Sequence, residues 1–279
     1  MRPINLITVM TSLCILSTAC HRTDSATDHR LGHIMGGGID SFSAKDAAAN
    51  IVSGGRKSSY PLSLTDLPDT VQTDIAGFDI SHWDGAINWQ QLHPPEGIYF
   101  VYIKATEGAD YVDPSFESNW AGVRNTLLHR GAYHFFMARQ SEAQQMLHAQ
   151  HFIKTVKNLE DGDMAPMVDV EDDPDINPEL FQARLLVFVR EIESYFKTTP
   201  LIYTTKDLYK KYLSLHNSFQ QYEMWIADYS YARPELCDKK NPRIWQFTDR
   251  GTIKGIPSRV DMDLFYNTPD DLKKLFVKK

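Results

Sequence analysis

The chain has 279 residues, of which 42% are hydrophobic and 11% aromatic, and its formal net charge is −7. This composition is typical of a globular protein with one sizeable core. The basic residues are scattered and form no stripe, which argues against a nucleic-acid partner. No P-loop and no dinucleotide-binding glycine pattern is present, so we expect no cofactor.

Residues 1–20 have the pattern of a bacterial lipoprotein signal. The apolar run over 4–16 is too short to span a bilayer, and small residues then precede Cys20. In such signals the cysteine is lipidated and becomes the first mature residue. We therefore expect an exported, membrane-anchored lipoprotein of the cell envelope, periplasmic or surface-facing. An ordinary secretory peptide cleaved after Ala19 is the alternative.

Residues 21–74 are rich in Ser, Asp, Ala and Gly, which favours a flexible linker. The amino-acid composition changes at Ile75. Residues 75–279 are predicted to form one domain without an internal repeat. With Cys14 removed in the signal and Cys20 lipidated, Cys237 remains alone, so no internal disulfide is expected. We expect the protein to be a monomer.

Within this domain, short apolar runs alternate with amphipathic stretches of helix length. Strands are predicted over 75–81, 99–105, 131–136, 165–171, 200–204, 224–229, 243–247 and 259–265. Helices are predicted over 114–129, 141–158, 178–196 and 206–215. Because helices follow only the earlier strands, the order predicts an α/β fold, a β/α barrel whose last part is irregular. In such barrels the chemistry gathers at the carboxyl ends of the strands.

The strand predicted over 165–171 ends in acid. Side chains alternate along a strand, so Met167, Asp169 and Glu171 share one face. Two carboxylates one pleat apart repel each other, which favours keeping one protonated near neutral pH. A general acid beside an ionised partner is the arrangement that cleaves glycosidic bonds. Taken alone, the segment is equally well explained as a strand that runs out into an acidic loop.

Carboxylates and large aromatic rings recur near the ends of the other predicted strands. Asp79 lies near the end of the first strand and Asp261 near the start of the last. Aromatic faces hold the apolar faces of sugar rings, so this mixture suits a carbohydrate groove. The residues that we expect to bind substrate there are Tyr133, Tyr203, Trp225, Trp245 and His82.

Two other constellations are better explained structurally. Lys104 and Glu107 are spaced for an ion pair. His148 and His151 share a helical face at i, i+3 spacing, but no motif supplies matching carboxylate ligands, so we expect no metal.

Read in order, eight motifs resemble those of glycoside hydrolase family 25, the Chalaropsis-type muramidases. They are Gly-Phe-Asp-Ile-Ser-His-Trp at 77–83, Ile-Lys-Ala-Thr-Glu-Gly at 103–108, Gly-Ala-Tyr-His-Phe at 131–135, Asp-Val-Glu at 169–171, Ile-Tyr-Thr at 202–204, Trp-Ile-Ala at 225–227, Trp-Gln-Phe at 245–247 and Val-Asp-Met-Asp at 260–263. The resemblance covers about 75–267. It implies a flattened, TIM-like β/α barrel of five βα units and three closing strands.

The resemblance also implies an activity, hydrolysis of the β-1,4 bond between N-acetylmuramic acid and N-acetylglucosamine in peptidoglycan. Glu171 would be the proton donor, supported by Asp169, with Asp79 and Asp261 in the acidic site. Either a carboxylate or the substrate's own 2-acetamido group would attack the anomeric carbon, and both routes retain configuration. We favour the acetamido route, with Asp169 holding the acetamide, because the resemblance supplies no clearly placed nucleophile.

A second class of function is a non-catalytic, glycan-binding envelope lipoprotein on the same barrel. The intact pair of Asp169 and Glu171 favours the enzyme, because a barrel that only bound glycan would not need the carboxyl group that donates the proton. A metal-dependent polysaccharide deacetylase would need an ordered histidine set, which the sequence does not contain.

Overall fold

The computed structural model describes residues 63–68, 75–92, 94, 97–214 and 217–279. The predicted signal segment 1–20 with Cys20, and most of the predicted linker 21–74, lie outside these residues. One part of that linker is ordered against the domain, because Leu67, after the 3-10 helix η1 (Leu64–Asp66), is 3% exposed and packs into the core. The packed chain therefore begins upstream of the predicted boundary at residue 75.

Eight strands close into a barrel, and a ninth short strand extends one of them. In chain order they are β1 (Ala76–Ile80), β2 (Ile98–Glu107), β3 (Tyr111–Val112), β4 (His129–Phe135), β5 (Met167–Val170), β6 (Leu201–Thr205), β7 (Met224–Ala227), β8 (Ile244–Gly251) and β9 (Val260–Phe265). Neighbours from β1 to β8 pair in parallel, with β3 only an antiparallel addition to the end of β2. The last strand, β9, runs antiparallel to both β8 and β1 and closes the ring.

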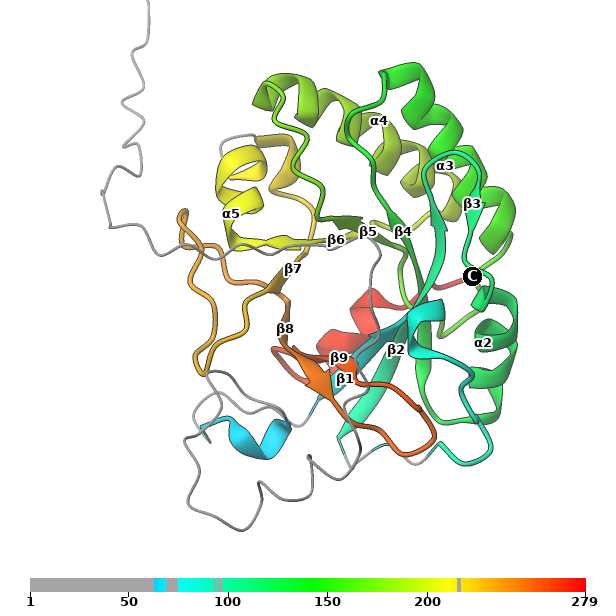
Figure 1. Cartoon of the computed structure of the whole chain (residues 1–279). Helices are drawn as coiled ribbons and strands as arrows, with labels where there is room; N and C mark the ends of the chain where they lie inside the picture. The colour runs from blue at the N-terminus through cyan, green and yellow to red at the C-terminus, as the bar shows by residue number, and fades with distance from the viewer. Residues whose placement is uncertain (1–62, 69–74, 93, 95–96, 215–216) are drawn as a thin grey trace, which may run out of the picture. The chain divides into compact units, whose positions relative to one another are not determined.

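The helices that follow the earlier strands lie outside this ring (Figure 1), whereas the last helix packs against the residues inside the barrel. The helices are α2 (Phe116–Gly122), α3 (Glu142–Val156), α4 (Pro178–Phe196), α5 (Lys206–Leu208), which continues as a π-helical turn η4 (Tyr209–Leu213), and α6 (Pro269–Leu272). Single 3-10 turns occur at η2 (His82–Asp84), η3 (Val123–Asn125), η5 (Asn217–Phe219) and η6 (Lys273–Leu275). None of the helices among the described residues is long and apolar enough to cross a bilayer.

Local sequence explains the longest helix, α4. The Asn177 side chain accepts hydrogen bonds from the backbone N–H groups of Glu179 and Leu180, and Pro178 occupies the first turn, where its missing N–H costs nothing. Its buried face recurs every three or four residues, at Phe181, Leu185, Phe188, Val189 and Ile192. The face packs on α3 and on the strands beneath.

The barrel encloses an aromatic core of its own, separate from the layer between strands and helices. Phe100 and Tyr102 of β2 meet Trp225 of β7 edge to face, with ring centroids 6.2 and 5.0 Å from the indole. The Tyr102 hydroxyl donates to the Ala165 carbonyl oxygen at 2.9 Å, which satisfies its polar end inside the barrel. The interior is therefore filled and is not a channel.

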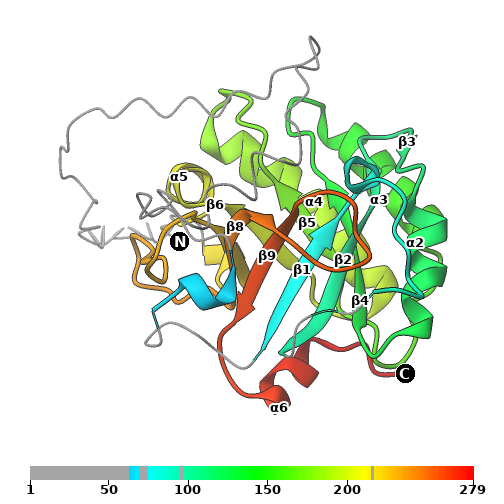
Figure 2. The same ribbon diagram turned by 60° about the horizontal axis from the view of Figure 1, so that its bottom comes forward.

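The predicted α/β barrel is confirmed, and all eight predicted strands are present. The predicted helix 114–129 is shorter, because α2 ends at Gly122, η3 follows, and β4 already begins at His129. Among the described residues between β1 and β2, η2 is the only helical segment. The three strands after α5 close the barrel without long helices between them, as Figure 2 shows for β8, β9 and β1.

This topology decides where the candidate residues meet. Parallel strands bring the carboxyl ends of β1, β5 and β6 to one end of the barrel. The antiparallel β9 brings its amino end there instead, and Asp261 pairs with Asp79 across the β1–β9 ladder.

Candidate active site

A cavity of about 100 Å³ opens at this end of the barrel. Its lining contains four carboxylates and four other polar side chains around one methionine: Asp79, Asp169, Glu171, Asp261, Tyr133, Tyr203, Tyr229, Gln246 and Met167. Six of the residues singled out from the sequence thus come together, namely Asp79, Tyr133, Asp169, Glu171, Tyr203 and Asp261. These residues come from chain segments that are spread over more than 180 residues, and the closed barrel brings them together. The cavity that they line is called the acidic pocket below.

The carboxylates of the acidic pocket are held in surroundings that disfavour negative charge. Burial first, and the charge of Glu171 second, raise the pKa of Asp169 well above its ordinary value. Burial likewise raises the pKa of Asp79, with Asp263 as the main repelling neighbour, and the pKa of Asp261, with Asp79 in that role. The repulsion expected from the sequence is therefore present, and together with burial it favours the neutral form of Asp169.

Glu171 differs from Asp169 in its exposure. Asp169 is 6% exposed within β5, whereas Glu171 follows the strand and is open to solvent at the mouth of the pocket. One buried oxygen of Asp169, Oδ1, has no hydrogen-bond partner among the described residues. An unpaired buried oxygen is costly, and it is available to a donor on a bound molecule.

A chain of hydrogen bonds crosses the pocket from Glu171 to Asp79. The Tyr203 hydroxyl lies 3.2 Å from Glu171 Oε1 and 2.9 Å from Gln246 Oε1. The Tyr229 hydroxyl also donates to Gln246 Oε1, at 2.9 Å, and Gln246 Nε2 donates to Asp79 Oδ2 at 2.9 Å. Gln246 therefore connects two tyrosines to one aspartate and fixes their relative positions.

The sequence did not single out Gln246 and Tyr229 as site residues. The period-two alternation of β8 was the available signal, because buried Trp245 and Phe247 face the outer layer and Gln246 between them faces inward. In β7 the same alternation places Trp225 and Ala227 on the inward face. Tyr229, two residues further on, lies on that side and lines the pocket.

Two predicted substrate-binding residues lie elsewhere. Trp225 is 0% exposed inside the barrel, where its Nε1 donates to Asp263 Oδ1 at 3.0 Å. Trp245 is also 0% exposed, packs in the outer layer and donates to the Asp228 carbonyl oxygen at 2.7 Å. The expectation that these two rings line the groove is wrong for this structure, because neither presents a face to solvent.

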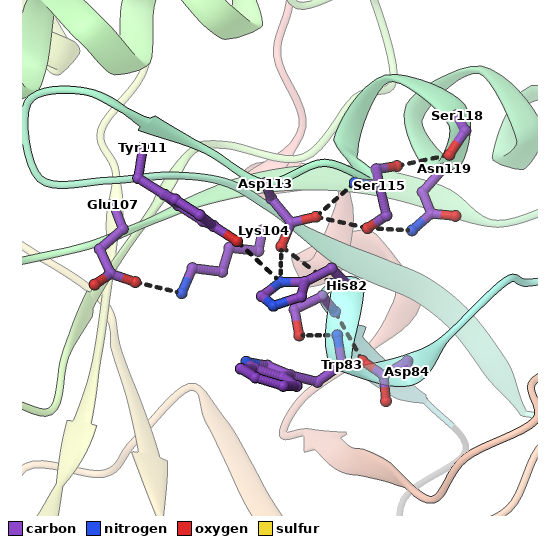
Figure 3. A network of polar contacts seen from close by, with 11 residues as sticks. His82, Trp83, Asp84, Lys104, Glu107, Tyr111, Asp113, Ser115, Ser118 and Asn119 are labelled. Atoms are coloured by element: carbon purple, nitrogen blue, oxygen red, sulfur yellow. Dashed lines mark hydrogen bonds and ion pairs between the residues drawn. The ribbon is translucent and has the colours of Figure 1, made fainter. Parts of the chain in front are cut away.

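His82 lies in the η2 turn, which follows β1 (Figure 3). It does not line the acidic pocket. Its Nδ1 is 2.8 Å from Asp113 Oδ2, and its ring contacts that of Trp83 with centroids 4.4 Å apart. Nearby, Lys104 Nζ is 2.8 Å from Glu107 Oε2, so the predicted ion pair forms.

His148 and His151, the two histidines on one helical face, form hydrogen bonds with other parts of the chain. His148 Nε2 is 2.9 Å from Gln140 Oε1, and His151 Nε2 is 3.0 Å from the Tyr111 carbonyl oxygen. Within the described ranges no group of three or more His, Cys, Asp or Glu side chains is arranged to hold a metal ion.

Comparison with known proteins gives one family. Residues 78–256 match the profile of glycosyl hydrolases family 25. The chain is 34% identical over 203 residues to the uncharacterized protein YegX of Escherichia coli strain K12, covering 71% of this chain and 72% of YegX. It is 26% identical over 201 residues to Lysozyme M1 of Streptomyces globisporus, covering 68% of this chain and 67% of that protein.

A solved structure agrees with these relatives. A family 25 glycosyl hydrolase from Bacillus anthracis superposes with a TM-score of 0.66 at 26% identity. The superposition covers 79% of this chain and 98% of that one.

The raised pKa values make a prediction about stability. An aspartate whose pKa is higher in the folded than in the unfolded chain stabilises the fold at low pH, and this contribution is lost as pH rises from about 4 through the folded pKa. We expect Asp261→Asn to raise the melting temperature at pH 7 and to change it little at pH 4. At pH 7 the free energy of unfolding should rise by about 1.4 kcal/mol for each unit of pKa shift that the variant removes.

Thermal unfolding of both proteins across this pH range checks the prediction. Asp207→Asn, at an exposed aspartate of α5, is the control and should shift neither end of the curve. A variant less stable than the wild type at pH 7 would mean that Asp261 is ionised and held by favourable partners.

Proposed function

The chain belongs to glycosyl hydrolase family 25 and is a glycoside hydrolase, and we propose that it cleaves peptidoglycan between N-acetylmuramic acid and N-acetylglucosamine. The observation that carries the proposal is the acidic pocket, with Asp169 and Glu171 side by side at the end of β5. Lysozyme M1, a relative by its sequence, supports the substrate. The cleaved β-1,4 bond is that of the muramic acid residue, and configuration is retained.

Glu171 is the general acid in this proposal. Gln246 Nε2 donates to Asp79, so Gln246 Oε1 is left to accept from the Tyr203 and Tyr229 hydroxyls. The Tyr203 hydroxyl has one hydrogen, which it donates either to Glu171 Oε1 or to Gln246 Oε1. When Gln246 receives it, a protonated Glu171 can donate to the phenol oxygen. A glycan bound over the mouth would also remove water from this exposed carboxyl, which favours the neutral acid.

Asp169 supports the reaction by holding the acetamide. Its unpaired Oδ1 is a buried acceptor in the acidic pocket, and the N–H of a 2-acetamido group is a donor that could reach it. An acetamide fixed in this way would have its carbonyl oxygen free to attack the anomeric carbon as Glu171 protonates the leaving oxygen. The intermediate carries positive charge, and Asp79 and Asp261, once ionised, would stabilise it.

Substrate contacts come from the remaining polar residues. Tyr133 and Tyr203 present hydroxyls to the pocket, and His82 lies beyond the end of β1. The glycan strand is the partner, the working unit is a monomer, and no cofactor enters the reaction.

The bond that is cut is the direct test. Digestion of purified peptidoglycan should leave N-acetylmuramic acid at the new reducing ends, as read by mass analysis after reduction. New ends of N-acetylglucosamine, or free peptides beside intact glycan, are incompatible with a muramidase. Glycan binding with no new reducing ends at all would favour the non-catalytic envelope lipoprotein.

Glu171→Gln tests the acid. The amide keeps the size of the side chain and its contact with Tyr203 but cannot deliver a proton, so turnover should fall about a hundredfold to ten-thousandfold. Folding and glycan binding should persist. Asp175→Asn, at an exposed carboxylate on the same loop, is the matched control. If Glu171→Gln kept more than about a tenth of wild-type turnover, a loss well short of that expected for a general acid, another group would be the acid.

The proposed location is the cell envelope, with the protein attached through lipid on Cys20. Two or more acyl chains hold a protein stably on a membrane, where one does not. Cys20→Ala should release the protein from the membrane fraction or leave it unprocessed. Fractionation and mass analysis of the mature amino terminus check this. A variant that stayed in the membrane fraction at wild-type level would exclude the anchor.

A further inference from the structure

Trp83 is the most exposed large aromatic side chain in the part of the chain that the structure describes, with 79% of its surface open. One exposed aromatic residue is ordinary by itself. This one lies four residues after Asp79, in the turn that follows β1.

The turn holds the Trp83 backbone firmly. Ser81 Oγ accepts from the Trp83 N–H at 3.2 Å, and the Ser81 N–H donates to Asp84 Oδ2 at 2.8 Å. The other oxygen of Asp84 accepts from Ser258 Oγ at 2.9 Å, which joins the turn to the chain just before β9. The indole is therefore exposed on a braced turn and not on a loose loop.

His82 is braced from the other side (Figure 3). Its backbone N–H and Nδ1 both lie within 3.0 Å of Asp113 Oδ2, and Ser115 donates twice to the second oxygen. Although burial opposes it, these hydrogen bonds lower the pKa of Asp113, so the carboxylate is ionised and Nδ1 carries the hydrogen. Nε2, the other ring nitrogen, has no hydrogen-bond partner among the described residues.

Tyr111 completes the surface. Its hydroxyl is 3.3 Å from His82 Nδ1, and its ring centroid is 6.1 Å from that of His82. Lys104 Nζ lies 5.9 Å from the centre of the Tyr111 ring. His82, Trp83 and Tyr111 together are called the rim platform below. It combines an open indole face with a free ring nitrogen and a hydroxyl.

The rim platform adjoins the acidic pocket. The η2 turn begins three residues after Asp79, and its Asp84 accepts a hydrogen bond from Ser258, three residues before Asp261. The acidic pocket itself measures about 100 Å³, below the roughly 300–1,000 Å³ of sites that enclose a whole small molecule. A glycan that reacts there must therefore have most of its length on surfaces outside it.

We propose that the rim platform is a second saccharide-binding site, which holds a sugar residue of the glycan strand next to the one in the acidic pocket. The inference rests on the proposed function and adds a specific surface to it. The apolar C–H face of a pyranose packs on the exposed indole, and a hydroxyl or acetamide group donates to His82 Nε2. A polar ligand with one apolar face fits this surface better than an acyl chain, because the polar groups around the indole would remain unsatisfied under a lipid.

Trp83→Ala removes the indole and, because the side chain is exposed, leaves the fold intact. Trp83→Phe keeps an aromatic face, and Tyr99→Ala deletes another exposed aromatic, 41% open, near the amino end of β2. Two measurements are made with glycan strands freed of peptides. One is the dissociation constant in the Glu171→Gln background by calorimetry, and the other is KM with Glu171 intact.

Trp83→Ala should weaken binding and raise KM roughly three- to tenfold, the value of one aromatic contact. Trp83→Phe should recover most of the loss, and Tyr99→Ala should match the parent. The rim platform alone would be overturned if Trp83→Ala cleaved glycan with a wild-type dissociation constant and KM. It would also be overturned if Tyr99→Ala weakened binding as much as Trp83→Ala. If the wild-type protein bound glycan but did not cleave it, the proposed hydrolase activity would be wrong. The effect of Trp83→Ala on the dissociation constant would still test the rim platform.

Discussion

The aromatic filling of the barrel is the constraint on which the rest of the structure depends. Phe100, Tyr102 and Trp225 occupy the interior, and the chain makes room for them with glycine. A Cβ on Gly77 would lie 2.2 Å from the Phe100 ring, and one on Gly131 would lie 2.3 Å from the Tyr102 ring. Side chains at these two positions would push the rings out of place. Small residues on β1 and β4 thus allow large ones on β2 between them.

This filling sets the electrostatics of the acidic pocket. Water cannot reach the carboxylates from below, so burial is the first cause of the raised pKa of Asp79, Asp169 and Asp261 alike. Asp263 is buried deeper, beside the Trp225 indole, and repels Asp79 from beneath. These surroundings therefore favour the neutral carboxyl groups, and their contribution to stability is lost as pH rises. A ligand on which positive charge develops would reverse that balance, because it favours the ionised carboxylates.

The hydrogen-bond chain through Gln246 connects opposite walls of the barrel. Gln246 of β8 contacts Asp79 of β1 and Tyr203 of β6, although 167 residues separate it from the aspartate. Rigid positioning of this kind is what a catalytic site needs, because a displacement of about 1 Å in a reacting group can cost a hundredfold in rate. The η2 turn, braced by Asp113 and Ser258, extends the same rigidity to the rim.

The sequence by itself determined the succession of strands along the chain, the barrel and the acid pair. The pair follows from period-two alternation, which places Asp169 and Glu171 on one face whatever surrounds them. The resemblance of the sequence motifs to family 25 also brought Asp79 and Asp261 into the predicted site. Alternation does not say how deep a residue lies, or whether its face is inside or outside a closed barrel. Trp225 lies below the pocket and Trp245 faces the helix layer, whereas Gln246, Tyr229 and Trp83 reach the functional end. Those assignments follow from barrel closure and strand register, which arise from contacts between distant segments and so belong to the tertiary structure alone.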